Sequence, residues 1–483
     1  MSKPINASLI ARYASANFVR QILGLLTGFL RPKLLSPELY GLWSLLKTIP
    51  VYAGHAHLGS REALRYLTPM HEAAGDEDLV RRTEDSVFFG SLAFTAPVCL
   101  TLFALALASS FDATARFGLA ATGVLVALNW YFEHYVNTLK GRQDFTPAIV
   151  GNLINAVGTF VLSLALIWLF GFYGVFAAVI LPMALVLGYL RSKGVLRRHR
   201  TFDRAIFINA VRIGFPIVGF NLVLAFVRTA DRYVIASTMG ARELGYYGIS
   251  AMVVGILMNI PGVSRDLTEP KLMQTLHSLP PALRFERFFM RPLIQSAFLM
   301  PLLIGPAVLC LPAAVNLLLP RYAPGILPTQ ILAAGSFFIA LTYPTRGIIV
   351  ADGMQGRVLA WLVPVLGAGI GLTLAAAHLG YGLAGVACGS TGASLLLFAT
   401  LYAMVTRRYA TAADALWQDT ALMLAPFPAM CLALPLCSAL VPDLHPVAAA
   451  LVRAIAFEAL FGAVFLIVMR LRPERIPSNG DGQ

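Results

Sequence analysis

Five charged side chains lie in stretches of this chain that are otherwise apolar enough to cross a membrane: Arg20, Lys47, Arg228, Asp231 and Arg232. A charge at the centre of a spanning helix costs roughly 2.5–3.5 kcal/mol on insertion scales, so such residues usually face an aqueous cavity, an ion pathway or a buried partner. Four of the five are basic. We therefore expect a cavity whose occupant is anionic.

The spacing of the last three places them on one face of a helix, since Arg228, Asp231 and Arg232 stand at i, i+3 and i+4. They could form a self-neutralised structural cluster. Alternatively, Asp231 holds one arginine while the other grips phosphate oxygens through its planar guanidinium. Arg20 lies near the middle of its helix, whereas Lys47 is close enough to a helix end to snorkel. We predict Arg20, Lys47, Arg228 and Arg232 as substrate-binding residues.

Other titratable groups offer coupling chemistry rather than catalysis. Asp231 and Glu133 could bind a coupling proton or sodium ion, although a structural pairing or an interface position also explains them. His55 and His57 are two residues apart, so they cannot share one helix face as metal ligands. We see no nucleophile elbow, phosphate-binding loop or metal cluster, and we predict no catalytic residue and no cofactor.

The composition requires a membrane. Hydrophobic residues make up 58% of the 483 residues before the 40 glycines are added, and charged residues only 13%. A soluble domain reaches roughly 45–50% with glycine included. A water-soluble fold cannot hide this much apolar surface.

Runs without Asp, Glu, Lys or Arg locate the spans, at about 20 residues per crossing. The runs Phe145–Leu190 and Val358–Thr406 are each about twice that length, and each contains a Gly/aromatic turn near its middle. Each therefore predicts a helical hairpin. We predict an all-α polytopic membrane protein with about 14 transmembrane helices, at 9–30, 40–59, 87–110, 117–139, 146–169, 172–190, 213–237, 244–264, 291–318, 324–349, 358–377, 381–405, 418–440 and 447–469.

Basic residues orient these spans. Most Lys and Arg fall on one side if both termini are cytoplasmic, as in the segment 191–200. This bias explains most of the net charge of +13, so no nucleic-acid partner is needed. The first twelve residues have no short apolar core followed by a cleavage site, and we expect the first helix to direct insertion itself.

Three short motifs recur in the same order at offsets of 205 to 215 residues. Glu38-Leu-Tyr-Gly pairs with Glu243-Leu-Gly-Tyr-Tyr-Gly, Lys140-Gly-Arg with Gln355-Gly-Arg, and Tyr173-Gly-Val with Tyr381-Gly-Leu. Six helices per unit predict two parallel repeats, a transporter architecture. The predicted domains are an N-terminal lobe (1–190), a basic cytoplasmic linker (191–212), a C-terminal lobe (213–406), two additional transmembrane helices (407–470) and a cytoplasmic tail (471–483).

The motif Leu34-Leu-Ser-Pro-Glu-Leu-Tyr-Gly-Leu-Trp43, followed by Leu58-Gly-Ser-Arg-Glu-Ala-Leu-Arg-Tyr66, resembles the opening of polysaccharide-transport proteins. So do Gly214-Phe-Pro216, Asp231-Arg-Tyr-Val-Ile235 and Glu243-Leu-Gly-Tyr-Tyr247. These proteins are the O-antigen and exopolysaccharide flippases of the multidrug/oligosaccharidyl-lipid/polysaccharide exporter superfamily. The resemblance covers about the first 400 residues.

The resemblance implies two six-helix lobes around a central cavity lined by helices 1, 2, 7 and 8, which here carry Arg20, Lys47, Arg228 and Arg232. It implies movement of a polyprenyl-pyrophosphate-linked glycan across the bacterial inner membrane by alternating access. A glycan polymerase and export machinery could be further partners. The two added helices are similar to those of the peptidoglycan-precursor flippases, so the branch stays open.

Two other functions remain in competition. A cation-coupled multidrug exporter of the same superfamily needs an acidic and aromatic site, which only Asp231 and Glu133 could supply. A membrane glycan polymerase or ligase needs a sizeable external loop with catalytic carboxylates or arginines, whereas the predicted external connections are short.

Overall fold

The structure is a computed structural model that describes residues 7–108, 111–142, 144–197, 199–274, 279–409, 413–439 and 445–471. Helices account for nearly all of these residues, and no strand occurs among them. Ten of the described helices are long and apolar enough to cross a membrane. The prediction of an all-α, multi-pass membrane protein is confirmed, whereas the count of 14 spans is not.

The chain forms two compact units that interleave in sequence: residues 1–252 with 353–393, and residues 253–352 with 394–483. Contacts in space define these units, whereas the predicted lobes are defined by repeated sequence. The lobe boundaries therefore remain a prediction.

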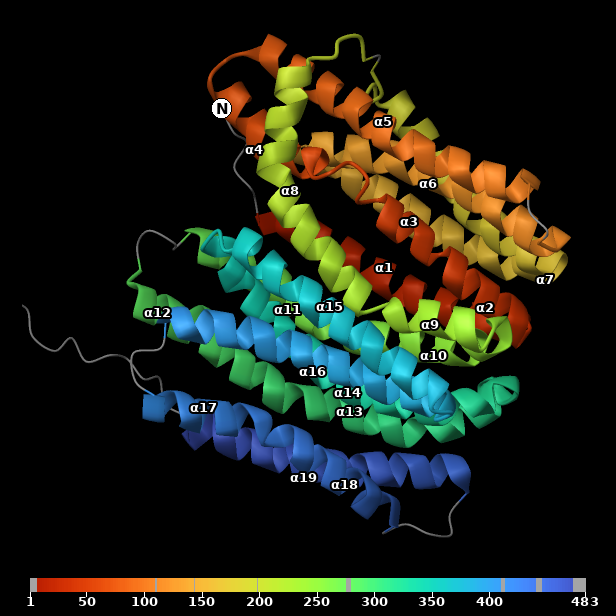
Figure 1. Cartoon of the computed structure of the whole chain (residues 1–483), viewed down its shortest axis with the longest axis vertical. Coiled ribbons are helices and arrows are strands. Elements are labelled where there is room, and N and C mark those ends of the chain that lie inside the picture. The colour runs from red at the N-terminus through yellow and green to blue at the C-terminus, as the bar shows by residue number, and fades with distance from the viewer. Residues whose placement is uncertain are drawn as a thin grey trace, which may run out of the picture. The chain divides into compact units, whose positions relative to one another are not determined.

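In the first unit, α5, α6 and α7 run side by side (Figure 1), and α1 packs against α7. The helices of this unit are α1 (Ala7–Leu34), α2 (Pro37–Leu46), α3 (Thr48–Ala53), α4 (Ser60–Ala73), α5 (Glu77–Ala108), α6 (Ala113–Gly141), α7 (Phe145–Ser192), α8 (Arg204–Val227), α9 (Ala230–Thr238), most of α10 (Ala241–Leu257), α15 (Gln355–His378) and the start of α16 (Gly382–Tyr409).

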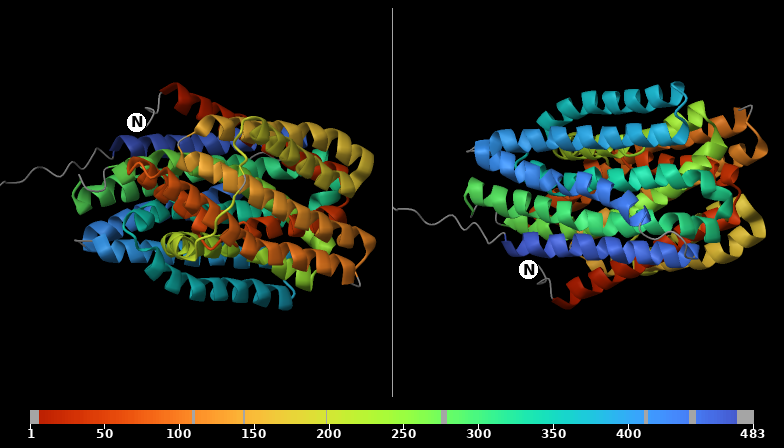
Figure 2. Two further views of the ribbon diagram at one scale, coloured as in Figure 1. Left: turned by 90° about the horizontal axis from the view of Figure 1, so that it is seen from above. Right: turned by 90° about the horizontal axis from the view of Figure 1, so that it is seen from below.

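In the second unit, α13 packs against both α14 and α19, and α19 lies beside α13 in the right-hand view of Figure 2. Its elements, besides the ends of α10 and α16, are α11 (Asn259–Gln274), α12 (Pro281–Phe285), the π-helix η1 (Glu286–Met290), α13 (Arg291–Leu318), the 3₁₀-helix η2 (Pro320–Gly325), α14 (Ile326–Ala351), α17 (Ala413–Leu424), α18 (Pro426–Ala439) and α19 (Pro446–Leu471).

Both predicted hairpins have their breaks where the sequence places them. Gly171 interrupts α7 with φ 54° and ψ −127°, a conformation that glycine adopts without a steric penalty. Gly380 and Gly382, both at positive φ, separate α15 from α16.

Four predicted spans, 40–59, 213–237, 244–264 and 418–440, are instead each divided between two helices. The span 40–59 ends at Leu46 and resumes as α3, because Pro50 has no N–H and its ring crowds the carbonyl of Leu46. The span 213–237 begins earlier, at Arg204, and breaks between α8 and α9 at Thr229. The Thr229 hydroxyl donates to the Ala225 carbonyl at 2.8 Å, a bond that favours bending.

A close backbone contact joins α2 to α10. A Cβ atom added at Gly41 would lie 1.8 Å from the Ala241 carbonyl oxygen, and one at Gly245 would lie 1.9 Å from that of Pro37. Only glycine therefore fits at these two positions. Membrane helices use small residues in this way to bring backbones together.

An ionic network holds the stretch before α8 against α5. The Asp85 carboxylate accepts hydrogen bonds from the backbone N–H groups of Arg200 and Thr201 at 3.0 and 3.3 Å. Arg197 bridges Asp85 and Glu84, at 2.8 Å from each. Part of the predicted linker 191–212 is thus fixed to the first unit, and its last residues belong to α8.

Candidate anion-binding cavity

A cavity of about 500 Å³ lies inside the first unit, lined by residues of α1, α2, α3, α6, α7 and α9 and of the connections beside α3 and α9. Three cationic side chains line it: Arg31, Lys47 and Arg232. No Asp or Glu is among its lining residues in the described part of the chain. The wall therefore combines basic groups with neutral amides and hydroxyls, including Asn129, Asn155 and Thr159.

The break between α2 and α3 positions Lys47. Ser36 caps the start of α2, where its side chain accepts from the Leu39 N–H at 3.4 Å, and α2 ends directly before Lys47. The ammonium group lies 5.9 Å from the centroid of the Tyr40 ring. Arg31 and Arg232 line the same cavity as Lys47, so the three cations share one site.

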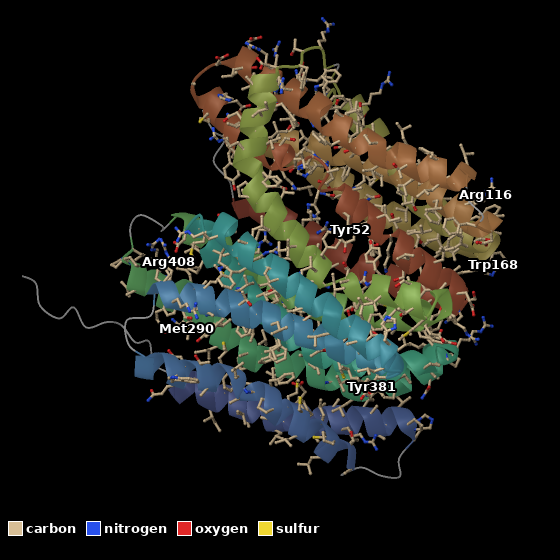
Figure 3. All side chains as sticks on the ribbon, viewed as in Figure 1. Tyr52, Arg116, Trp168, Met290, Tyr381 and Arg408 are labelled. Atoms are coloured by element: carbon tan, nitrogen blue, oxygen red, sulfur yellow. The ribbon has the colours of Figure 1, made fainter. Side chains whose placement is uncertain are left out.

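Hydroxyl pairs attach α3 to the α8–α9 region. The Thr48 and Tyr233 hydroxyls lie 2.7 Å apart, and the Tyr52 hydroxyl pairs with that of Thr229. The Tyr52 ring stacks on Phe226 at 4.4 Å between centroids. Tyr52 therefore lies where the broken helices meet, and Figure 3 labels it in the interior of the first unit.

Asp231, next to Arg232, belongs to a different polar cluster. The residue is 5% exposed, and its carboxylate accepts hydrogen bonds from the hydroxyls of Tyr247 (2.6 Å) and Ser390 (3.0 Å). A second, much smaller cavity of about 10 Å³ adjoins it, lined also by Thr373 of α15. That volume is close to the minimum that holds one water molecule.

The structure brings two of the predicted substrate-binding residues together, Lys47 and Arg232. Arg20 is exposed on α1 and does not line the cavity. Arg228 is half-buried at the end of α8, and Glu133 is half-buried on α6; neither lines the cavity. The roles of Arg20, Arg228 and Glu133 stay predictions.

Arg31 is a cationic residue of the cavity wall that was not predicted from the sequence, because the first predicted span ends at residue 30. A signal in the sequence is that Arg31 and Trp43 lie on either side of a short turn, where an arginine can stack on an aromatic ring. The guanidinium carbon lies 4.9 Å from the centroid of the Trp43 ring. Asn129 and Asn155 were missed as well, since a neutral amide in a helix carries little signal by itself.

Comparison with known proteins agrees with the resemblance seen in the sequence. Residues 72–265 match the model of a family described as "Polysaccharide biosynthesis protein". The resemblance to polysaccharide-transport proteins is confirmed. No curated protein matches the chain in sequence.

Solved structures show the fold. A structure titled "Lipid II flippase MurJ, inward closed conformation" has a TM-score of 0.71 at 15% identity, covering 95% of this chain and 99% of that one. An inward-facing MATE multidrug-resistance transporter of the MOP superfamily has a TM-score of 0.68 at 16% identity, covering 81% and 94%. This chain therefore has the fold of MOP-superfamily transporters.

A third match concerns the polarity of the site. A MOP-superfamily transporter from Pyrococcus furiosus, whose title reports a reverse polarity of its binding pocket, has a TM-score of 0.56 at 15% identity. It covers 85% of this chain, which covers 94% of it. The same fold therefore occurs with binding pockets of different polarity. The ligand of each pocket depends on the residues that line it and not on the fold.

Proposed function

We propose that this protein is a flippase that moves a polyprenyl-pyrophosphate-linked oligosaccharide across the bacterial inner membrane by alternating access, with both termini in the cytoplasm. The observation that carries the proposal is the cavity lined by Arg31, Lys47 and Arg232, with no carboxylate among the described residues of its wall. Three neighbouring cations repel one another in a low-dielectric site. An anion between them removes that repulsion.

A pyrophosphate group meets the requirements of this site. Moving it from water into the protein carries a large desolvation cost, which direct contacts to buried cations offset. Arginine offers a planar fork that matches phosphate oxygens in a bidentate manner, and lysine a compact point charge. Asn129, Asn155 and Thr159 add amide and hydroxyl groups that can exchange hydrogen bonds with sugar hydroxyls. The lipid tail would stay in the bilayer.

Asp231 is the candidate for coupling to a proton or a sodium ion. It is a buried carboxylate, and it lies beside a small cavity with the oxygens of Ser390 and Thr373. A bound cation would compete with the hydrogen bonds from Tyr247 and Ser390. Because Asp231 precedes Arg232 on the same short helix, a movement of the backbone at Asp231 would also move Arg232.

The alternative of a multidrug exporter draws support from the fold, since one matched structure is a multidrug-resistance transporter. The cavity argues against it, because Arg31, Lys47 and Arg232 would repel an organic cation. A glycan polymerase is favoured less, since described connections on the predicted external side are short: α1 and α2 are joined by Leu35 and Ser36, and α9 and α10 by Met239 and Gly240. A polymerase and export machinery remain candidate partners.

The test is a lipid extract from a strain that lacks the protein, analysed by mass spectrometry. We expect a polyprenyl-pyrophosphate oligosaccharide to accumulate and one surface glycan to be lost, with both effects reversed by the wild-type gene. An unchanged lipid pool together with new sensitivity to organic cations would overturn the proposal in favour of drug export. A single repeat unit that has already reached the outer leaflet would indicate a polymerase.

A further inference from the structure

Three residues of the cavity wall have buried polar atoms that find no hydrogen-bond partner among the described residues. They are the Nε atom of Arg31, the Nε1 atom of Trp43 and the Oδ1 atom of Asn155. All three residues line the same cavity. Buried polar groups are nearly always satisfied, since leaving one unpaired loses its interactions with water. Three unpaired polar atoms on residues that line one cavity therefore indicate a bound group.

Packing fixes the two donors next to each other. The Arg31 guanidinium stacks over the Trp43 ring at 4.9 Å. The Trp43 ring in turn meets the Phe176 ring edge-on, with centroids 5.1 Å apart and planes at 86°. Trp43 is only 4% exposed, so its indole N–H cannot turn to bulk water. Asn155 comes from α7, the helix against which α1 packs.

The chemistry of the three atoms defines a ligand. The indole N–H of Trp43 can only donate, and so can the N–H of Arg31. Two adjacent donors, one of them charged, suit an oxyanion such as a phosphate or carboxylate. The Asn155 oxygen can only accept, so it requires a donor such as a hydroxyl.

We propose that Arg31, Trp43 and Asn155 form a subsite that binds an oxyanion together with a neighbouring hydroxyl of the translocated head group. This inference rests on the proposed function and adds a ligand class to it. The oxyanion belongs either to the phosphate that links sugar to lipid or to the carboxylate of an acidic sugar. Lys47 and Arg232 supply charge to the same cavity, whereas the subsite supplies directional hydrogen bonds.

The experiment measures binding of soluble probes to the purified full-length protein by titration calorimetry. The probes are inorganic pyrophosphate, D-glucuronate and methyl glucoside. The variant Trp43→Phe removes the N–H and keeps a ring beneath Arg31. We expect the wild type to prefer an anionic probe over methyl glucoside, and Trp43→Phe to lower that affinity by about ten- to hundredfold. A loss for pyrophosphate identifies the lipid-linked phosphate, and a loss confined to glucuronate identifies an acidic sugar.

Two further variants complete the design. Asn155→Leu removes the acceptor at similar size, and should weaken glucuronate binding without changing the melting temperature greatly. Trp168→Phe is the matched control, since Trp168 is 76% exposed on α7 and Figure 3 labels it at the rim of the first unit, away from Tyr52. It should bind as the wild type does.

Equal probe affinities in the wild type, Trp43→Phe and Asn155→Leu would overturn the subsite, and so would a wild type that binds neither anionic probe. These results are separate from the test of function. A deletion strain that accumulates lipid-linked glycan, rescued equally by wild type and Trp43→Phe, retains the flippase and rejects the subsite. A deletion strain without accumulation rejects the flippase, whatever the probes show.

Discussion

Asp231 and Arg232 are neighbours in the chain, yet they line different cavities. Arg232 lines the basic cavity with Lys47 and Arg31, whereas Asp231 lines the small cavity beside Ser390. A hydrogen bond between the two residues links the sites, since the Asp231 side-chain Oδ1 atom accepts from the backbone N–H of Arg232 at 2.8 Å. The short helix α9 therefore connects the proposed substrate site to the proposed coupling site.

Replacing Arg232 with Gln should abolish most transport. Gln keeps a polar side chain but removes the charge and the bidentate grip on phosphate, so we expect transport to fall at least tenfold, for a loss of about 1.5–3 kcal/mol of binding. The measurement is rescue of the surface glycan in the deletion strain. Arg116→Gln is the control, because Arg116 instead donates to the Ala106 carbonyl beside the α5–α6 connection. Equal rescue by both variants would remove Arg232 from the site.

Arg20 tests whether the substrate path extends beyond the cavity. Its side chain is exposed and outside the cavity wall, yet a charge in a predicted span is kept for function more often than for packing. We expect Arg20→Ala to abolish transport while folded protein remains in the membrane, and Arg228→Ala to do the same. Normal glycan export by well-expressed Arg20→Ala would exclude Arg20 from the path.

Asp231→Asn should separate stability from coupling. Asn keeps the shape, but its oxygen is a weaker acceptor for Tyr247 and Ser390 than a carboxylate, so the free energy of unfolding should fall by about 1–3 kcal/mol. Transport should also lose its dependence on the proton or sodium gradient. Tyr247→Phe removes one hydrogen bond and keeps the carboxylate, so it should lower the melting temperature alone. Gradient-dependent transport in Asp231→Asn would assign coupling to another residue.

Glycine positions on α10 offer a matched pair. Gly245→Ala would place a methyl group 1.9 Å from the Pro37 carbonyl oxygen, so α2 and α10 must separate. Gly255→Ala meets nothing within 4 Å and should stabilise the helix by up to about 1 kcal/mol. We expect Gly245→Ala either to lower the melting temperature of the purified protein or to separate α2 from α10. The separation is measured by the reaction of a thiol reagent with a cysteine introduced in place of Leu244. A wild-type melting temperature and an unreactive cysteine would show that the contact is not needed.

The stability of the first unit should depend on pH through His199. Burial lowers the pKa of this imidazole below its usual 6.5, whereas the hydrogen bond that the imidazole donates to Asp85 acts in the opposite direction and raises the pKa. The folded protein then binds fewer protons than the unfolded chain between the lowered pKa and about 6.5, so stability falls as pH drops through that window. Melting temperatures from pH 8 to pH 5 measure the effect.

His199→Gln should flatten this pH profile, because Gln does not titrate. His445→Gln is the control, since His445 is exposed at the start of α19. The groups that face His199 are Asp85 at 2.8 Å and the Tyr135 hydroxyl at 3.1 Å, with Arg197, Glu84 and His134 nearby. An unchanged profile in His199→Gln would assign the pH dependence to another of these groups.

Much of the fold could be predicted because membrane spanning is a local property. Hydropathy and length identify a span without reference to any other helix, and glycine tolerates the backbone at Gly171 wherever it occurs. Charges that are costly in the membrane identified Lys47, Asp231 and Arg232 for the same reason. The four breaks inside predicted spans were not predicted, although Pro50 is a local signal for the break between α2 and α3.

The composition of the cavity could not be predicted, because it depends on which helices meet. Asp231 and Ser390 are 159 positions apart, and their contact arises only when α9 packs against α15 and α16. Arg31 has the local signature of an interface residue, and only its stacking on Trp43 and the closure of α7 over α1 place it in the cavity. Hydropathy along the chain determines how the protein lies in the membrane, whereas helix packing selects the polar groups that share one cavity.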